Sequence, residues 1–283
     1  MCKQFACGLL LLFCAFVAAS CDSAVEKKEE PDVVFVTTPH RTVKEMLKLA
    51  GVSRDDIVYD LGSGDGRVVI AAAKDFGARA VGIDIDPKLI DESRDNARNS
   101  GVAHRVRFEQ NDVMKADISQ ATVVTLYMLP AMNTQLLPKL HKELQPGTRV
   151  VSHRFLIGDW KPDMTLKAYE TMIYLWVVPA TVRGEWRVTM RNDTETRRFR
   201  LHLRQTYQEL EGFMEDDQRK YNVAAAALYG KEIAISVVDT MRGQRFLMEL
   251  DGSLKGETLT GTARVTEARH PMPVSYAWNA VRN

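Results

Sequence analysis

The chain has 283 residues, 45% of them hydrophobic, and a formal net charge of +1 at pH 7. This length leaves room for one large domain and one small one, each with an ordinary hydrophobic core. Because positive and negative side chains nearly balance, no global field favours nucleic acid as a partner. All four cysteines lie within the first 21 residues, so the rest of the chain can hold neither a disulfide nor a thiolate metal site, and we expect no metal.

Residues 1–21 have the pattern of a targeting segment. Lys3 supplies a positive start, and the apolar run at residues 8–19 is too short to cross a bilayer as a helix. The sequence Ala-Ala-Ser-Cys that ends at Cys21 resembles the lipobox of bacterial lipoproteins, with alanine in place of the usual leucine. We therefore expect lipidation of Cys21 and a membrane-anchored protein that faces the periplasm. A cleaved secretory signal, or an uncleaved anchor that keeps the folded domains in the cytoplasm, are the alternatives.

Residues 22–35 are charged and polar and are predicted to form a flexible tether. Beyond them, apolar residues at helical spacing predict a helix that starts near Pro39 and ends at Gly51. From there to residue 179, strand and helix patterns alternate, which is typical of an α/β domain with a parallel sheet. We expect this domain to occupy residues 36–179.

The sequence Asp-Leu-Gly-Ser-Gly-Asp-Gly at residues 60–66 follows a short apolar strand and precedes a helix-forming stretch. These three parts form the first unit of a doubly wound sheet, where ligands bind at the carboxyl ends of the strands and glycines let the backbone approach them. Asp60 and Asp65 would repel a phosphate at the helix N-terminus and instead suit a cationic ligand. S-adenosylmethionine is net positive and meets this requirement. The residues expected to bind it here are Asp60, Gly62, Ser63, Gly64, Asp65 and Gly66.

The next two predicted strands, residues 80–85 and 106–109, also end near acids. Asp84 is placed where a carboxylate can accept both ribose hydroxyls of an adenosyl ligand. Asn111 and Asp112 follow the third strand, where an acid can accept a hydrogen bond from an adenine amino group. The alternative is that Asp84 and Asp112 are ordinary loop acids.

Residues 60–66, Asp84 and Asn111-Asp112 resemble the cofactor motifs of class I S-adenosylmethionine-dependent methyltransferases. A narrower resemblance, over residues 36–160, is to the protein-lysine methyltransferases that act on the ATP synthase c-subunit. It is carried by the sequences Val36-Thr37-Thr38-Pro39, Val123-Val124-Thr125-Leu126-Tyr127-Met128-Leu129-Pro130, Pro138-Lys139-Leu140 and Pro146-Gly147-Thr148-Arg149-Val150-Val151-Ser152. The resemblance implies a doubly wound, seven-stranded, Rossmann-like methyltransferase sheet with S-adenosylmethionine as the cofactor.

The fourth predicted strand, residues 122–128, runs into a turn that lies beside the transferable methyl group in such a fold. We expect Tyr127 to form the acceptor-side wall as the catalytic candidate, although it can equally be a packed strand-end tyrosine. Pro130 in the same turn, and Thr37 and Thr38 before the first helix, are candidates for substrate binding, with simple helix capping as the alternative for the threonines. The turn lacks the Asn/Asp-Pro-Pro-Tyr pattern of base and glutamine-amide methyltransferases.

The remaining α/β elements are predicted as a helix at 133–144, which Pro138 can break in its first turn, a strand at 149–155 and a hairpin within 166–178. Residues 180–283 then change character, because apolar residues alternate with polar ones between glycine turns. This period of two predicts a small antiparallel all-β barrel or sandwich. We interpret residues 222–228, which are rich in alanine, as one helical turn.

These patterns favour an S-adenosylmethionine-dependent methyltransferase that acts on a protein lysine. A small-molecule or lipid methyltransferase is the alternative within the same chemistry. The alternative without catalysis is a membrane-anchored protein that binds an adenosyl ligand. S-adenosylmethionine is made in the cytoplasm, so an exported domain would be separated from its supply.

Overall fold

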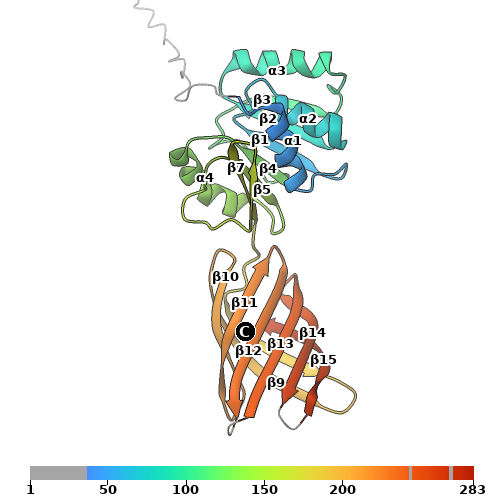
Figure 1. Ribbon diagram of the computed structural model, residues 1–283, viewed down its shortest axis with the longest axis vertical. Coiled ribbons are helices and arrows are strands. Elements are labelled where there is room, and N and C mark those ends of the chain that lie inside the picture. The colour runs from blue at the N-terminus through green and yellow to red at the C-terminus, as the bar shows by residue number, and fades with distance from the viewer. Residues whose placement is uncertain (1–36, 242–243, 268–269) are drawn as a thin grey trace, which may run out of the picture. The chain divides into compact units, whose positions relative to one another are not determined.

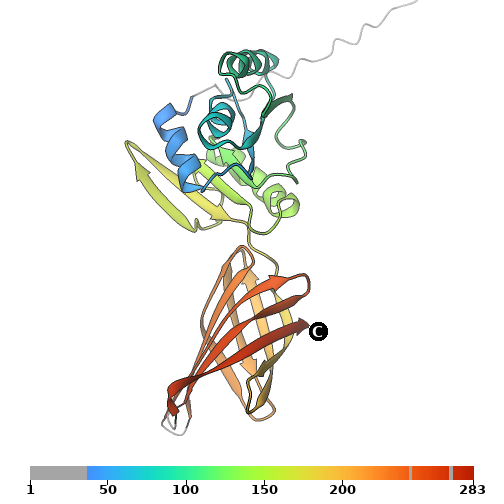
Figure 2. The ribbon, with the colours of Figure 1, turned by 90° about the vertical axis from the view of Figure 1, so that its right-hand side faces the viewer.

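The computed structural model describes residues 37–241, 244–267 and 270–283 (Figure 1, Figure 2). The predicted targeting segment with Cys21 and the predicted tether at 22–35 lie outside the described residues. Among the helices that are described, none combines the length and the apolar character needed to cross a membrane.

A seven-stranded sheet forms the first part of the fold, with the strand order β3-β2-β1-β4-β5-β7-β6. Its first five strands are parallel, and β7 pairs antiparallel with both β5 and β6. This is the doubly wound sheet that the sequence predicts. The strands are β1 (Ile57–Leu61), β2 (Arg79–Asp84), β3 (Val106–Gln110), β4 (Val123–Leu126), β5 (Arg149–His153), β6 (Met164–Ala168) and β7 (Thr171–Val177).

Helices cover both faces of this sheet, because its central strands are apolar on both sides. On one face, α1 (His40–Leu49), α2 (Arg67–Phe76) and α3 (Pro87–Asn99) pack on alternate strand residues that include Val58 and Val123. On the other face, α4 (Pro130–Glu143) packs on the intervening residues, such as Tyr59 and Val124 (Figure 1).

The helix predicted from residue 133 begins earlier, at Pro130, and Pro138 does not break it. Pro130 occupies the first helical position, where its missing N–H and fixed φ are well tolerated. Pro138 is exposed, so the carbonyl group that it leaves without a backbone donor can bond to water. The prediction of a break at Pro138 was therefore wrong.

The second part of the fold is a closed antiparallel barrel with the strand order β10-β11-β12-β13-β14-β15-β8-β9. Alternate residues fill its interior, as Trp186, Val188 and Met190 do on β8, so the barrel alternative was correct. Its strands are β8 (Gly184–Arg191), β9 (Thr196–Thr206), β10 (Glu209–Glu215), β11 (Lys220–Tyr229), β12 (Glu232–Met241), β13 (Gln244–Lys255), β14 (Thr258–Glu267) and β15 (His270–Arg282).

The helical turn predicted at residues 222–228 was wrong, because these residues belong to β11. Ala225, Ala226 and Ala227 pair with Ser236, Ile235 and Ala234 of β12. The hydrogen bonds to neighbouring strands outweigh the helix propensity of alanine, which is worth only a few tenths of a kcal/mol per residue, roughly.

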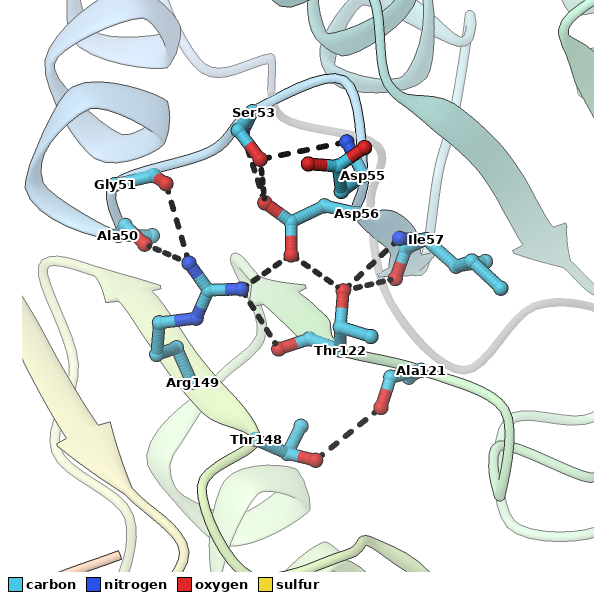
Figure 3. A network of polar contacts seen from close by, with 10 residues as sticks. All are labelled: Ala50, Gly51, Ser53, Asp55, Asp56, Ile57, Ala121, Thr122, Thr148 and Arg149. Atoms are coloured by element: carbon cyan, nitrogen blue, oxygen red, sulfur yellow. Dashed lines mark hydrogen bonds and ion pairs between the residues drawn. The ribbon is translucent and has the colours of Figure 1, made fainter.

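A polar network fastens the amino-terminal ends of the central strands (Figure 3). The Asp56 carboxylate accepts hydrogen bonds from the Ser53 backbone N–H at 2.8 Å and from the Thr122 hydroxyl at 2.7 Å. It also forms an ion pair with Arg149, whose guanidinium donates to the carbonyl oxygens of Ala50 and Gly51 at 2.9 and 3.1 Å. The network therefore joins β1, β4, β5 and the end of α1 at the sheet edge opposite the carboxyl ends of the parallel strands.

Candidate active site

The carboxyl ends of the parallel strands bring the predicted site residues to one edge of the sheet. Asp60 of β1 is in register with Gly82 of β2 and Thr125 of β4, and Leu126 is in register with Ser152 of β5. The loops that follow these strands therefore lie next to one another, as the order β3-β2-β1-β4-β5 requires.

Asp60 is a buried carboxylate that accepts a hydrogen bond from the Thr125 hydroxyl at 2.5 Å. Burial raises the pKa of Asp60 to about 7; the Thr125 hydrogen bond opposes the rise, and the charges of Asp84 and Asp65 add to it. Sequence reasoning missed Thr125, because on the strand it looks like one more β-branched core residue.

The glycine loop turns back over the end of β2. The backbone N–H groups of Gly62 and Ser63 both donate to the Ile83 carbonyl oxygen, at 2.8 and 2.9 Å. Gly62 and Gly64 have φ angles of 79° and 53°, in the left-handed region that favours glycine. The loop therefore keeps its tight path without a side chain at either position.

Gly66 and Ser63 have packing roles in this loop. A Cβ atom at Gly66 would lie 2.8 Å from both Phe108 and Ser93, so this glycine lets the start of α2 pack closely. The Ser63 hydroxyl is buried near Gly82 and has no hydrogen-bond partner within the described part of the chain.

Asp84, at the end of β2, is nearly buried and accepts backbone N–H groups from Gly64 at 2.8 Å and from Asp86 at 3.0 Å. Each of its two oxygens accepts one of these bonds, so lone pairs remain for a ligand. Asn111 donates its backbone N–H to the Asp84 carbonyl oxygen, and Asp112, which is half-buried, accepts the N–H of Met114. The structure thus places Asp84 against the glycine loop and Asn111 against Asp84, with Asp112 next along the chain.

Asp65 differs from the other acids because it already has a cationic partner. Arg67 donates hydrogen bonds to both of its carboxylate oxygens, with Nε–Oδ1 and Nη2–Oδ2 distances of 2.9 and 2.5 Å. Burial alone would raise the pKa of Asp65, but the hydrogen bonds and charge of Arg67 outweigh it and hold the pKa below its ordinary value. Asp65 is therefore largely neutralised by its own chain.

Asp60 and Asp84 lack such a partner: no lysine, arginine or histidine within residues 37–241, 244–267 and 270–283 forms an ion pair with either. Two close acids without a cation, beside a loop that allows close backbone approach, fit a ligand with a positively charged end. These residues therefore fit S-adenosylmethionine by the chemistry of their donor set. The same described residues contain no group of three or more His, Cys, Asp or Glu side chains that could hold a metal ion.

On the neighbouring strand ends, aromatic rings surround Tyr127, which is half-buried. The His153 ring lies 4.1 Å from the Tyr127 ring, and the Phe155 ring is stacked on it at 6.1 Å between centroids. Burial lowers the pKa of His153 to about 4, with a further contribution from the positive charge of Arg154, so the imidazole is neutral near pH 7. The Thr38 hydroxyl contacts His153 Nδ1 at 3.2 Å, whereas Thr37 and Pro130 are exposed.

Comparison with known proteins places this architecture in a family. The protein-family model described as the ANTKMT methyltransferase domain matches residues 60–164 of this chain. A protein-lysine N-methyltransferase of Saccharolobus islandicus is 47% identical over 153 residues, which cover 52% of this chain and 95% of the relative. A lysine N-methyltransferase of Xenopus laevis, named for the ATP synthase c-subunit, is 40% identical over 156 residues, which cover 55% of this chain and 67% of the relative.

A solved structure extends the comparison to the cofactor. The structure of an RNA methyltransferase from Salinibacter ruber, in complex with S-adenosyl-L-homocysteine, is 52% identical, covers 52% of this chain and 96% of that chain, and aligns with a TM-score of 0.51. Together with the acids and glycines at the ends of β1 and β2, these matches identify the cofactor as S-adenosylmethionine. The chain therefore belongs to the same family of class I S-adenosylmethionine-dependent methyltransferases as the Saccharolobus islandicus enzyme.

Proposed function

We propose that this enzyme transfers a methyl group to the side-chain amine of a protein lysine. The observation that carries the proposal is the aromatic wall of Tyr127, His153 and Phe155, which lies at the ends of β4 and β5, next to the β1 end that carries Asp60. Aromatic rings favour an alkylamine, which is cationic when it arrives. The names of the Saccharolobus islandicus and Xenopus laevis relatives support lysine as the acceptor.

The cofactor is proposed to lie along the ends of β1, β2 and β3. Asp60 would balance the positive methionine end, Asp84 would accept the ribose hydroxyls, and Asn111 with Asp112 would meet the adenine. The backbone of the glycine loop would lie close to the cofactor at Gly62, Ser63 and Gly64. The loop would keep its shape through the ion pair of Asp65 with Arg67 and the packing of Gly66 against Phe108. When bound, S-adenosylmethionine supplies a methyl group on a sulfonium, which is already a good leaving group.

The protein then has to align the acceptor and exclude water. Tyr127 is proposed as the wall of the acceptor slot, with Thr37, Thr38 and Pro130 near its entrance. An amine attacks only when it is neutral, and a site lined by aromatic side chains lowers the pKa of a lysine by removing water from its charged form. The neutral His153 adds no positive charge that would repel an arriving ammonium group.

RNA is the second candidate acceptor, because the Salinibacter ruber protein is named an RNA methyltransferase and is 52% identical. Aromatic side chains also stack on unpaired bases, but a net charge of +1 supplies no general attraction for RNA phosphates, so lysine stays the first candidate.

The experiment is transfer of tritiated methyl groups from S-adenosylmethionine into an extract of a strain that lacks the gene. Portions of the product are treated with protease or with ribonuclease, and labelled protein is examined by mass spectrometry. We expect label that protease removes and that maps to lysine. At cofactor concentrations near the wild-type Kd, Asp84→Asn should lower this label, whereas Asp75→Asn, which changes an exposed acid of α2, should leave it unchanged. Label that only ribonuclease removes would replace lysine by RNA, and label that appears only in lipid or small molecules would exclude both.

A further inference from the structure

Arg67 links the glycine loop to the segment that precedes α1. Two of its nitrogens hold Asp65 of the loop, and its third, Nη1, donates to the Thr38 carbonyl oxygen at 2.9 Å. Charged hydrogen bonds of this kind are stronger than neutral ones and fix the geometry of both partners. The position of Thr38 is therefore tied to the position of the glycine loop.

Thr38 passes this link on to the acceptor side. Its side chain is buried, and its hydroxyl contacts His153 Nδ1 at 3.2 Å, across 115 residues of sequence. The His153 ring in turn lies against Tyr127 at 4.1 Å. One connection thus runs from Asp65 through Arg67, Thr38 and His153 to Tyr127.

The turn that follows His153 is held in a strained conformation. Arg154 has a φ angle of 69°, which costs a residue with a side chain roughly 1 kcal/mol or more. Its neighbours hold it in place: the Ser152 hydroxyl donates to the Phe155 carbonyl oxygen at 2.7 Å, and Asn133 Nδ2 donates to that of Leu156 at 3.2 Å. This turn brings Phe155 onto the Tyr127 ring, so His153 and Phe155 contact Tyr127 from one rigid support.

We propose that Thr38 and His153 are positioning residues that couple the glycine loop to the acceptor wall at Tyr127. The inference rests on the proposed function, because Tyr127 is taken there as the acceptor wall. The coupling has a physical origin in the glycine loop: a ligand that contacts Asp84 and the backbone near Gly64 shifts the loop, and Asp65 passes this shift to Arg67. Any resulting shift of Arg67 is transmitted to the Thr38 carbonyl, then through the Thr38 hydroxyl to His153.

The test follows the His153 ring directly in the full-length protein. The chain has six histidines, and ¹³C labelling at the ring Cε1 position gives each a resonance, with that of His153 assigned from its loss in His153→Gln. S-adenosyl-L-homocysteine is the probe, and calorimetry measures its Kd in parallel. Thr38→Val removes only the hydroxyl, Thr38→Ser retains it, and Thr42→Val alters a buried threonine of α1 that takes no part in the connection.

We expect S-adenosyl-L-homocysteine to shift the His153 resonance in the wild type, in Thr38→Ser and in Thr42→Val, but not in Thr38→Val. The Kd of Thr38→Val should stay within about threefold of the wild type, while its rate of methyl transfer into protein should fall roughly threefold to tenfold, the value of one hydrogen bond. A His153 resonance that still responds in Thr38→Val, or that never responds in the wild type, overturns the coupling. A wild type that couples normally but labels no lysine overturns the proposed substrate instead.

Discussion

Thr125 donates its hydroxyl hydrogen to the carboxylate of Asp60 across 2.5 Å, and this is the one side-chain hydrogen bond recorded for that buried acid among the described residues. A single neutral donor does not replace the water that Asp60 loses on burial. The pKa of Asp60 is accordingly raised by burial from 3.8 to about 7, and the nearby Asp84 and Asp65 add to the rise. The site is thus poised to accept a cation, and its behaviour should depend on pH.

Cofactor binding should release a proton below neutral pH. The pKa of Asp60 is higher in the ligand-free folded protein, at about 7, than in the unfolded chain, at 3.8, so protonation of Asp60 stabilises the fold. This stabilisation is complete below pH 3.8 and is lost as the pH rises through about 7. A cationic ligand favours the ionised form, so affinity for S-adenosylmethionine should rise with pH up to about pH 7 and fall again once the ligand's α-amino group, with a pKa of about 8, loses its proton. Calorimetry in buffers of different ionisation enthalpy should find close to one proton released at about pH 6, and net proton uptake by the ligand amine at about pH 8.5. Equal release at both pH values, or unchanged release in Asp60→Asn, would contradict the assignment.

Asp84→Ala should weaken cofactor binding about 10-fold to 100-fold, because a hydrogen bond to a charged group contributes roughly 1.5–3 kcal/mol. The carboxylate also accepts the Gly64 and Asp86 N–H groups, so some loop order is lost with it. Asp84→Asn retains one acceptor oxygen and should show an intermediate Kd. Calorimetry with S-adenosyl-L-homocysteine measures the series, and Asp75→Asn serves as the matched control. Wild-type affinity in Asp84→Ala would place the cofactor elsewhere.

Changes at Tyr127 should separate its ring from its hydroxyl. Tyr127→Phe retains the ring against His153 and Phe155 and should keep the rate if only the aromatic surface acts. Tyr127→Ala removes the wall and should lower kcat more than cofactor affinity, since its contacts are on the acceptor side. Initial rates of tritiated methyl transfer, together with cofactor Kd, check both. Equal losses of kcat and cofactor affinity in Tyr127→Ala would argue for a role in folding instead.

Arg149→Met should destabilise the fold without changing the site. It leaves the buried carboxylate of Asp56 without its cation and frees the carbonyl groups of Ala50 and Gly51 (Figure 3). Breaking such a pair from one side costs about 3 kcal/mol in free energy of unfolding. Urea unfolding measures this loss, and Arg98→Met, which breaks an exposed pair with Asp95, should cost about 0.5 kcal/mol or less. Similar losses in the two variants would mean that the network adds little.

Cys21→Ser tests membrane attachment, which stays a prediction from the sequence. If Cys21 is lipidated, the variant should lose labelling by a palmitate analogue and accumulate as an unprocessed precursor. The measurement is metabolic labelling followed by electrophoresis, with Cys14→Ser as the control. Normal processing of Cys21→Ser would favour a secretory cleavage or an uncleaved anchor. The domain limits at residues 36–179 and 180–283 likewise stay predictions.

The sequence alone predicted the elements whose signals are local. The glycine turn after β1 can be recognised in the sequence because its left-handed backbone angles require glycine. The parallel strands can be recognised as apolar runs because both of their faces are buried. The barrel strands show the period of two that one buried face imposes. Acids at strand ends could be placed together because parallel strands end at one edge of a sheet. The predictions were wrong where the folded structure overrides the local preference of a residue. The alanines of β11 were predicted as a helical turn, and the proline within α4 was predicted to break its helix.

The tertiary structure alone decided which polar groups meet. Thr38 and His153 are 115 residues apart, and no period in the sequence links them. Arg67 could have been a solvated helix residue, yet the loop turns Asp65 onto it, and among the described residues Asp60 and Asp84 are left without a cationic partner. Local patterns depend on the backbone angles that each residue allows and on which face of a strand or helix is buried. Both can be judged from residues that are neighbours in the sequence. Hydrogen bonds between distant side chains depend on how strands and helices pack, and only the folded chain brings those side chains within reach of one another.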